Sequence, residues 1–182
     1  MGQFIKIEPA GLQGLEADHH QYLTFVLGGE TFAIAILCIK EIIEYGKLTG
    51  VPMMPAFIRG VINLRGAVVP VIDLQARFGR KSVAVGRRTC IVIVEIAAGD
   101  ETQVVGVLVD QVNEVVEIPA TDIEPAPTFG AGVRTDFIAG MGKLAGAFVV
   151  ILQLDAVLSV DELARVTQAE LGLPLSAAEA AG

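Results

Sequence analysis

The chain has 182 residues, of which 53% are hydrophobic and 19% are charged, and its formal net charge is −8. This composition excludes a disordered chain, which needs low hydrophobicity and high charge, and a coiled coil, which needs far more Ala, Glu, Lys, Leu and Arg. The acidic balance argues against a nucleic-acid-binding protein. Twenty glycines and eight prolines separate short runs of valine and isoleucine, which is typical of a β-rich protein with many turns.

The first twenty residues are predicted to form a flexible leader, because Pro9, Gly11 and Gly14 interrupt any periodic pattern there. The adjacent His19 and His20 are assigned to this leader, since neighbouring side chains on a strand point to opposite faces and do not make a metal site. No stretch of the chain is apolar for long enough to suggest a signal peptide or a membrane span. We therefore expect a cytoplasmic protein.

A β-hairpin is predicted next, with strands at 21–27 and 31–36 joined by a Gly-Gly turn. In the second strand the large Phe32 and Ile34 alternate with the small Ala33. Large residues pointing inward and small residues pointing outward suit a small closed barrel, so we interpret the hairpin as part of one.

The following segment combines a predicted helix with a predicted strand. Pro55 favours the start of a short helix over 56–64, ending near Gly66. Residues 67–74 read as a strand. Pro70 cannot donate a hydrogen bond to a neighbouring strand, so this strand is expected to lie at a sheet edge or to carry a bulge.

The second half of the chain repeats this organisation. Its predicted elements are strands at 89–96, 102–109, 112–118, 137–141 and 145–154, a long loop at 122–135, and a C-terminal helix that begins near a Ser159–Glu162 capping box. Residues 161–182 are expected to hold that helix and a frayed Ala-rich tail. Two β-barrels side by side over residues 21–160 are the natural packing for this many short strands, and a single sandwich is the alternative.

Positive charge is concentrated in one window of this acidic chain. Residues 59–88 carry seven basic residues and one acidic residue, a local balance of +6. Two interpretations remain open at this point: a solvated basic face, or a patch that meets an acidic partner. The basic residues are Arg59, Arg65, Arg77, Arg80, Lys81, Arg87 and Arg88.

Residues for catalysis are scarce. The carboxylates Asp110, Glu114 and Glu117 lie close together in the sequence, but a solvated strand face explains them better than a catalytic site. Cys38 and Cys90 lie in apolar runs without metal-ligand spacing, so they are expected to be buried free thiols. We therefore expect no enzyme activity, no metal and no cofactor, and binding must come from the surface.

A stretch near the middle of the chain carries a family resemblance. The segment 57–66 reads Phe-Ile-Arg-Gly-Val-Ile-Asn-Leu-Arg-Gly, and Val-Pro-Val-Ile-Asp-Leu follows at 69–74. Together they resemble the signature of the CheW family of bacterial chemotaxis coupling proteins. The likeness extends over about residues 20–160, with further landmarks at Gln21–Phe25, Gly28, 107–112, Ala126-Pro127 and Gly140-Met141-Gly142.

This resemblance implies a mainly β fold of two SH3-like five-stranded barrels packed together. It also implies binding surfaces rather than a catalytic centre. The residues that match receptor-binding positions of the family are Ile39, Glu41, Gly60, Asn63 and Arg65. Those that match kinase-binding positions are Thr89, Gly106 and Val115. The basic connection at 77–88 and both termini depart from the family pattern.

The function that the resemblance implies is a non-catalytic adaptor, which joins the histidine kinase CheA to the cytoplasmic tips of methyl-accepting chemoreceptors. Through receptor arrays it would lie at the inner face of the membrane, without entering the membrane or binding nucleic acid. One alternative is an adaptor of a chemosensory pathway that does not serve flagella. Two others are a barrel that binds oligonucleotides or peptides, and a small-molecule enzyme with a site at Asp110.

Overall fold

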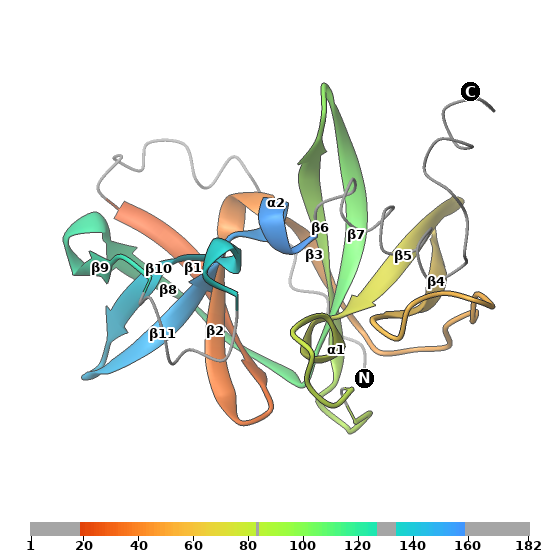
Figure 1. The fold of residues 1–182 in the computed structure, drawn as a ribbon, viewed down its shortest axis with the longest axis horizontal. Helices are drawn as coiled ribbons and strands as arrows, with labels where there is room; N and C mark the ends of the chain where they lie inside the picture. Colours follow the sequence, from red (N-terminus) through yellow and green to blue (C-terminus); the bar gives the residue numbers. More distant parts are fainter. Residues whose placement is uncertain (1–18, 83, 127–133, 159–182) are drawn as a thin grey trace.

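The computed structural model describes residues 19–82, 84–126 and 134–158, which form two β-sheets lying side by side (Figure 1). A six-stranded sheet has the order β8-β1-β2-β11-β10-β9, and a five-stranded sheet has the order β3-β6-β7-β5-β4. The strands are β1 (His19–Leu27), β2 (Glu30–Ala35), β3 (Ile39–Glu44), β4 (Ile58–Leu64), β5 (Ala67–Asp73), β6 (Cys90–Ala98), β7 (Glu101–Val109), β8 (Gln111–Pro119), β9 (Ile123–Glu124), β10 (Ile138–Leu144) and β11 (Ala147–Leu152). The short helices are η2 (Ile36–Cys38), α1 (Leu74–Arg77), η3 (Ala120–Asp122), η4 (Thr135–Phe137) and α2 (Leu154–Val157).

The two sheets exchange strands. The hairpin β1–β2 is followed by β3, which pairs with β6 in the five-stranded sheet, and the hairpin β6–β7 is followed by β8, which pairs with β1 in the six-stranded sheet. The chain therefore crosses between the sheets twice. This arrangement confirms the prediction of two SH3-like subdomains packed together. The two-residue β9 is an additional strand of the six-stranded sheet.

The faces of β2 point the opposite way to the prediction. Phe32 and Ile34 are fully buried in the larger core, which both sheets share, whereas Ala33 is fully buried in a smaller core with Tyr22 and Ile151. The small residues thus face the interior of the six-stranded barrel, where space is limited. Both faces of this strand are buried. The large residues lie on the other face, in the core between the two barrels, which is called the seam below.

A chain of aromatic rings crosses that seam. Phe25 stacks on Phe32, Phe32 contacts Phe78, and Phe78 contacts Phe137, with ring centroids 6.2, 5.8 and 6.1 Å apart. Such spacing is within the favourable range for aromatic pairs. The rings come from β1, β2, the end of α1 and η4, so they tie segments far apart in the sequence into one core.

An internal repeat underlies the two barrels. The hairpin β4–β5 and the hairpin β10–β11 are offset by 80 residues, and the same pairing irregularity occurs near the start of each. The turns match as well. Arg65 and Gly66 have φ angles of 51° and 89°, and Ala145 and Gly146 have 50° and 81°. Positive φ at both central residues is the requirement of a type I′ hairpin turn.

Three of the predicted elements need correction. The helix predicted over 56–64 is wrong, because Ile58–Leu64 forms strand β4. The strand that contains Pro70 is not an edge strand, since β5 lies between β4 and β7; its pairing with β7 begins only at Val71, beyond the proline. β1 begins at His19, two residues earlier than predicted. The predicted leader up to residue 18 and the predicted helix from Ser159 lie outside the described residues.

Candidate functional site

Arg65 and Glu41 form a two-pronged ion pair on the five-stranded barrel. Arg65 Nη1 lies 2.8 Å from Glu41 Oε2, and Arg65 Nη2 donates to Glu41 Oε1 at 3.2 Å. Glu41 lies on β3 and Arg65 in the β4–β5 turn, and β3 and β4 are the two edges of this sheet. The pair therefore joins the sheet edges where the barrel closes, although 24 residues separate its members.

The turn that carries Arg65 is held by Asn63, whose side-chain oxygen accepts a hydrogen bond from the Gly66 backbone N–H at 2.8 Å. The hydrogen bond and negative charge of Glu41 raise the pKa of the Arg65 guanidinium, which stays charged. The Arg65 side chain is 72% exposed, while that of Glu41 is 15% exposed. An exposed guanidinium in a fixed orientation can exchange its carboxylate partner for one on another protein.

Ile39 and Gly60, the other two residues predicted to bind a receptor, are buried. Ile39 is only 6% exposed and packs in the shared core. A Cβ on Gly60 would come within 2.5 Å of the Thr49 carbonyl oxygen, and Gly60 has a φ of 150°. The structure thus brings Glu41, Asn63 and Arg65 together at the surface, whereas Ile39 and Gly60 are buried.

The three residues predicted to bind a kinase do not form one surface. Val115, on β8, is exposed, but Thr89 is only 4% exposed. Gly106 is buried in β7, where a Cβ would lie 2.8 Å from Ile91 Cγ2. Only Val115 is therefore placed to touch a partner directly. Thr89 and Gly106 can influence binding only through the residues that they position.

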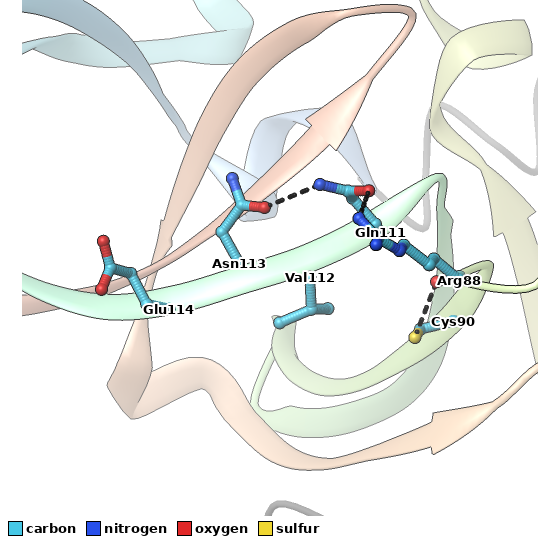
Figure 2. A pocket seen from close by; sticks show the side chains of 6 residues that line it. All are labelled: Arg88, Cys90, Gln111, Val112, Asn113 and Glu114. Carbon is cyan, nitrogen blue, oxygen red and sulfur yellow. Dashed lines mark hydrogen bonds between the residues drawn. The ribbon is translucent and has the colours of Figure 1, made fainter.

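A shallow groove of about 530 Å³, which no sequence motif indicates, lies close to Thr89 and Val115. Figure 2 shows its lining: Arg88 and Cys90 on one side, with Gln111 to Glu114 of β8 crossing beside them. Gln111 accepts from Arg88 Nη1 at 3.4 Å and donates to Asn113 Oδ1 at 3.0 Å. The paired arginines at 87 and 88 and the alternating polar residues of β8 were the available signals, but only the fold brings them together.

Cys38 and Cys90 are free cysteines, but both are only partly buried, which corrects the expectation of buried thiols. The Cys90 thiol lies in this groove. Burial raises its pKa, and the charge of Glu44 acts in the same direction, while a hydrogen bond from the Val112 backbone opposes them. The thiol also contacts the Arg88 carbonyl oxygen at 3.1 Å. A protonated thiol in this setting is a packing group rather than a nucleophile.

Asp110, the centre of the enzyme alternative, has a structural role. Its Oδ2 accepts a hydrogen bond from the Gly28 backbone N–H at 2.7 Å, and its Oδ1 accepts from Gln75 Nε2 at 3.4 Å. These bonds tie the β1–β2 turn to α1. In the part of the chain that the structure describes, no cluster of His, Cys, Asp or Glu is arranged to hold a metal ion. Among the same residues, no helix has the length and apolar character needed to cross a membrane.

The comparisons with known proteins agree with this geometry. Residues 21–162 match the family model described as CheW-like domain. Chemotaxis protein CheW of Klebsiella aerogenes is 35% identical over 151 residues, which cover 83% of this chain and 89% of that protein. Chemotaxis protein CheW of Rhizobium meliloti is 32% identical over 142 residues, covering 78% and 89%.

A solved structure is similar as well. The crystal structure of scaffolding protein TtCheW from Thermoanaerobacter tengcongensis superposes with a TM-score of 0.70 at 34% identity. The match covers 78% of this chain and 94% of that one. Sequence and fold therefore agree over nearly the whole described region, and the chain belongs to the CheW-like family.

Proposed function

We propose that this chain is a non-catalytic adaptor of chemotaxis signalling, which couples the histidine kinase CheA to the cytoplasmic tips of methyl-accepting chemoreceptors. Its place is in the cytoplasm, at the inner face of the membrane, where receptor arrays hold it. Membership of a family whose solved relative is titled a scaffolding protein supports this role. The observation that carries it is the exposed Arg65–Glu41 pair, which occupies the receptor-binding positions of the family resemblance.

The receptor tip is the partner assigned to this pair. Arg65 keeps a fixed orientation because Asn63 closes its turn and Glu41 holds its guanidinium. A helical receptor tip with an exposed carboxylate competes with Glu41 for this guanidinium, while its apolar side chains lie on the barrel surface. Ile39 and Gly60 maintain the shape on which the helix lies.

The kinase is assigned to a different face, around Val115 on β8. Because Val115 belongs to the six-stranded sheet and Arg65 to the five-stranded sheet, the two partners do not compete for one strand. Holding both partners at once raises the effective concentration of each near the other. Thr89 and Gly106 contribute from below the surface, through packing.

Calorimetric titration tests the proposal with two variants that serve as controls for each other. The wild-type chain is titrated with a CheA regulatory fragment and, separately, with a receptor-tip fragment from the same organism. We expect micromolar or tighter binding to each. Arg65→Ala should weaken receptor binding alone, and Val115→Asp should weaken kinase binding alone.

The two failures of this experiment have different meanings. If the wild-type chain binds neither fragment, the coupling function is wrong for this protein. If each substitution weakens both partners equally, the two binding surfaces are not separate, and the assignment of Arg65 and Val115 to different partners fails.

A further inference from the structure

We propose that the groove beside Arg88 receives an extended acidic segment of the kinase, gripped by Arg87 and Arg88. This inference rests on the proposed coupling function and specifies the chemistry of its kinase-binding side. It concerns the basic connection at 77–88, where this chain departs from the family pattern. It also decides between the two interpretations of the basic window, a solvated face and a patch for an acidic partner.

Four of the seven cations in the basic window form ion pairs or lie over aromatic rings within the molecule. Arg59 pairs with Asp73 at 3.1 Å, Arg65 with Glu41 at 2.8 Å and Arg80 with Glu30 at 3.3 Å. Arg77 lies over the Phe57 and Phe137 rings and donates to the Val157 carbonyl oxygen at 2.9 Å. These four side chains are thus already engaged in contacts within the molecule.

The remaining cations are Lys81, Arg87 and Arg88. All three are exposed, and within residues 19–82, 84–126 and 134–158 none of them forms an ion pair. Three exposed cations without an ion pair thus lie on one short connection of an acidic protein. A charged surface of sign opposite to the rest of the molecule is suited to steering and orienting a partner of complementary charge.

The turn that presents the two arginines is built into the fold. The Thr89 hydroxyl accepts a hydrogen bond from the Gly86 backbone N–H at 2.7 Å, and the Thr89 N–H donates to the Gly86 carbonyl oxygen at 3.3 Å. The Thr89 carbonyl oxygen accepts from the Tyr45 N–H at 3.2 Å. Buried Thr89 therefore fixes a turn whose outer residues are Arg87 and Arg88. Thr89 is a positioning residue, which explains how a side chain without surface exposure affects a binding face.

The groove itself suits an extended chain. β8 is the outermost strand on its side of the six-stranded sheet, with β1 as its neighbour. Figure 2 shows Gln111 and Asn113 along the same stretch of β8, next to Arg88. Their side-chain amides can donate to and accept from peptide groups. Four residues of strand span roughly 13 Å, so a short extended peptide fits along this stretch.

The charges of the groove also determine the orientation of the bound segment. Arg88 lies at the Gln111 end, and Glu114 lines the opposite end. A uniformly acidic segment would be repelled by Glu114. The segment that fits has its carboxylates at the Arg87–Arg88 end and neutral or basic residues towards Glu114 and Val115.

Charge reversal in calorimetric titrations with the CheA regulatory fragment tests this inference. Arg87→Glu and Arg88→Glu should each weaken binding by about fivefold or more at low salt, because each removes an attraction and adds a repulsion. The difference from wild type should shrink as salt rises from about 0.05 M to about 0.5 M, as screening predicts. Receptor-tip binding should not change.

Lys143→Glu is the matched control, because it makes the same change in net charge elsewhere. Gly142, its neighbour, faces Ile118, which is seven residues along β8 from Gln111, a distance of roughly 23 Å. The control should change kinase affinity by less than about twofold at low salt, since Lys143 lies more than a Debye length from the Arg88 end of the groove, where the carboxylates of the segment are expected. An equal effect of Lys143→Glu and Arg88→Glu would overturn the inference, because net charge alone would then explain the result.

Two variants of Thr89 test the positioning role. Thr89→Val removes the hydroxyl that holds Gly86, and it should weaken kinase binding and flatten its salt dependence. Thr89→Ser keeps the hydroxyl and should restore both. If Thr89→Ser fails to restore the salt dependence, the turn does not act through its arginines.

Three other outcomes distinguish a failure of the proposed function from a failure of the acidic segment alone. No binding of the wild-type chain to the kinase fragment contradicts the proposed function and this inference with it. Normal kinase binding that is insensitive to Arg87→Glu and Arg88→Glu leaves the function standing and overturns the acidic segment. Displacement of the kinase fragment by a single-stranded oligonucleotide at physiological salt would assign the groove to nucleic acid instead.

Discussion

Arg65 has a backbone conformation that side chains other than glycine rarely adopt, with a φ of 51°. The cost of such a conformation is on the order of 1 kcal/mol. Ala145, at the equivalent turn of the other barrel, has a φ of 50°. Because both repeats accept the same conformation, it belongs to the hairpin rather than to binding. The feature particular to Arg65 is its side chain, which Glu41 orients.

Arg65→Ala should leave the protein folded and weaken receptor binding. The ion pair is largely solvent-exposed on the arginine side, so its loss should reduce the free energy of unfolding only slightly. Affinity for a receptor-tip fragment should fall by about tenfold, because the oriented guanidinium is gone. Urea denaturation and calorimetry measure the two effects, and Arg65→Lys separates charge from the two-pronged geometry. Loss of the folded circular dichroism signal in Arg65→Ala would show that Arg65 is needed for folding rather than for receptor binding alone.

The two thiols should react slowly with alkylating agents at neutral pH. Burial raises the pKa of both Cys38 and Cys90, and nearby carboxylates reinforce the shift. The pKa of each thiol is higher in the folded protein than in the unfolded chain. The thiols therefore favour the folded state at low pH, and this contribution to the free energy of unfolding is lost as the pH rises from the unfolded pKa through the folded one. Iodoacetamide labelling followed by mass spectrometry should show rates below that of glutathione at neutral pH, rising at more alkaline pH. A labelling rate equal to that of glutathione at neutral pH would contradict the prediction of slow alkylation.

At the scale of elements, strand β4 shows what a short sequence pattern leaves undecided. Pro55 is a helix-start signal, and seven residues are too few for periodicity to separate a helix from a strand. The β-branched Val61 and Ile62 favour a strand, and the Arg65–Gly66 turn then returns the chain as β5. The helix prediction gave too much weight to the proline and overlooked the hairpin turn.

The candidate site was predictable to a similar, partial extent. The motif at 57–66 identifies Asn63 and Arg65 from sequence alone, because its residues are consecutive. The contact of Arg65 with Glu41 depends on β3 and β4 being the two edges of one sheet, which strand pairing decides. The groove beside Arg88 likewise needs β6 and β8, from different sheets, to lie next to each other. Contacts of this kind come from topology, so motif matching does not reveal them.

Gly106→Ala should destabilise the five-stranded barrel. A Cβ at this position would lie 2.8 Å from Ile91 Cγ2 and 3.3 Å from Val71 Cγ2, so the strands on both sides of β7 must shift. Overpacking of this kind costs about 1–3 kcal/mol. Urea denaturation measures the cost, and Gly46→Ala is the control, because a Cβ there has nothing within 4 Å. An unchanged midpoint for Gly106→Ala would show that β7 has room for a methyl group.

At the scale of the whole molecule, the two barrels form one folding unit. The larger core takes fully buried residues from both sheets, such as Leu23 and Phe25 in the six-stranded sheet and Ile91 and Leu108 in the five-stranded one. Crossing strands also prevent either sheet from completing itself without the other half of the chain. The two proposed binding faces, one on each barrel, are thus held in fixed relation to each other.

Phe32→Ala should therefore weaken both barrels together. Phe32 is fully buried, and its ring contacts Phe25 and Phe78 at the seam, so truncation should cost about 3–5 kcal/mol. The chain has two tyrosines and no tryptophan, and Tyr22 lies in β1 of one sheet while Tyr45 follows β3 of the other. Tyrosine fluorescence in Tyr22→Phe and Tyr45→Phe backgrounds thus reports each barrel separately during urea denaturation. We expect coincident transitions with and without Phe32→Ala, because the shared core gives neither barrel independent stability. A transition at Tyr22 that precedes the one at Tyr45 would show instead that the five-stranded barrel stands alone.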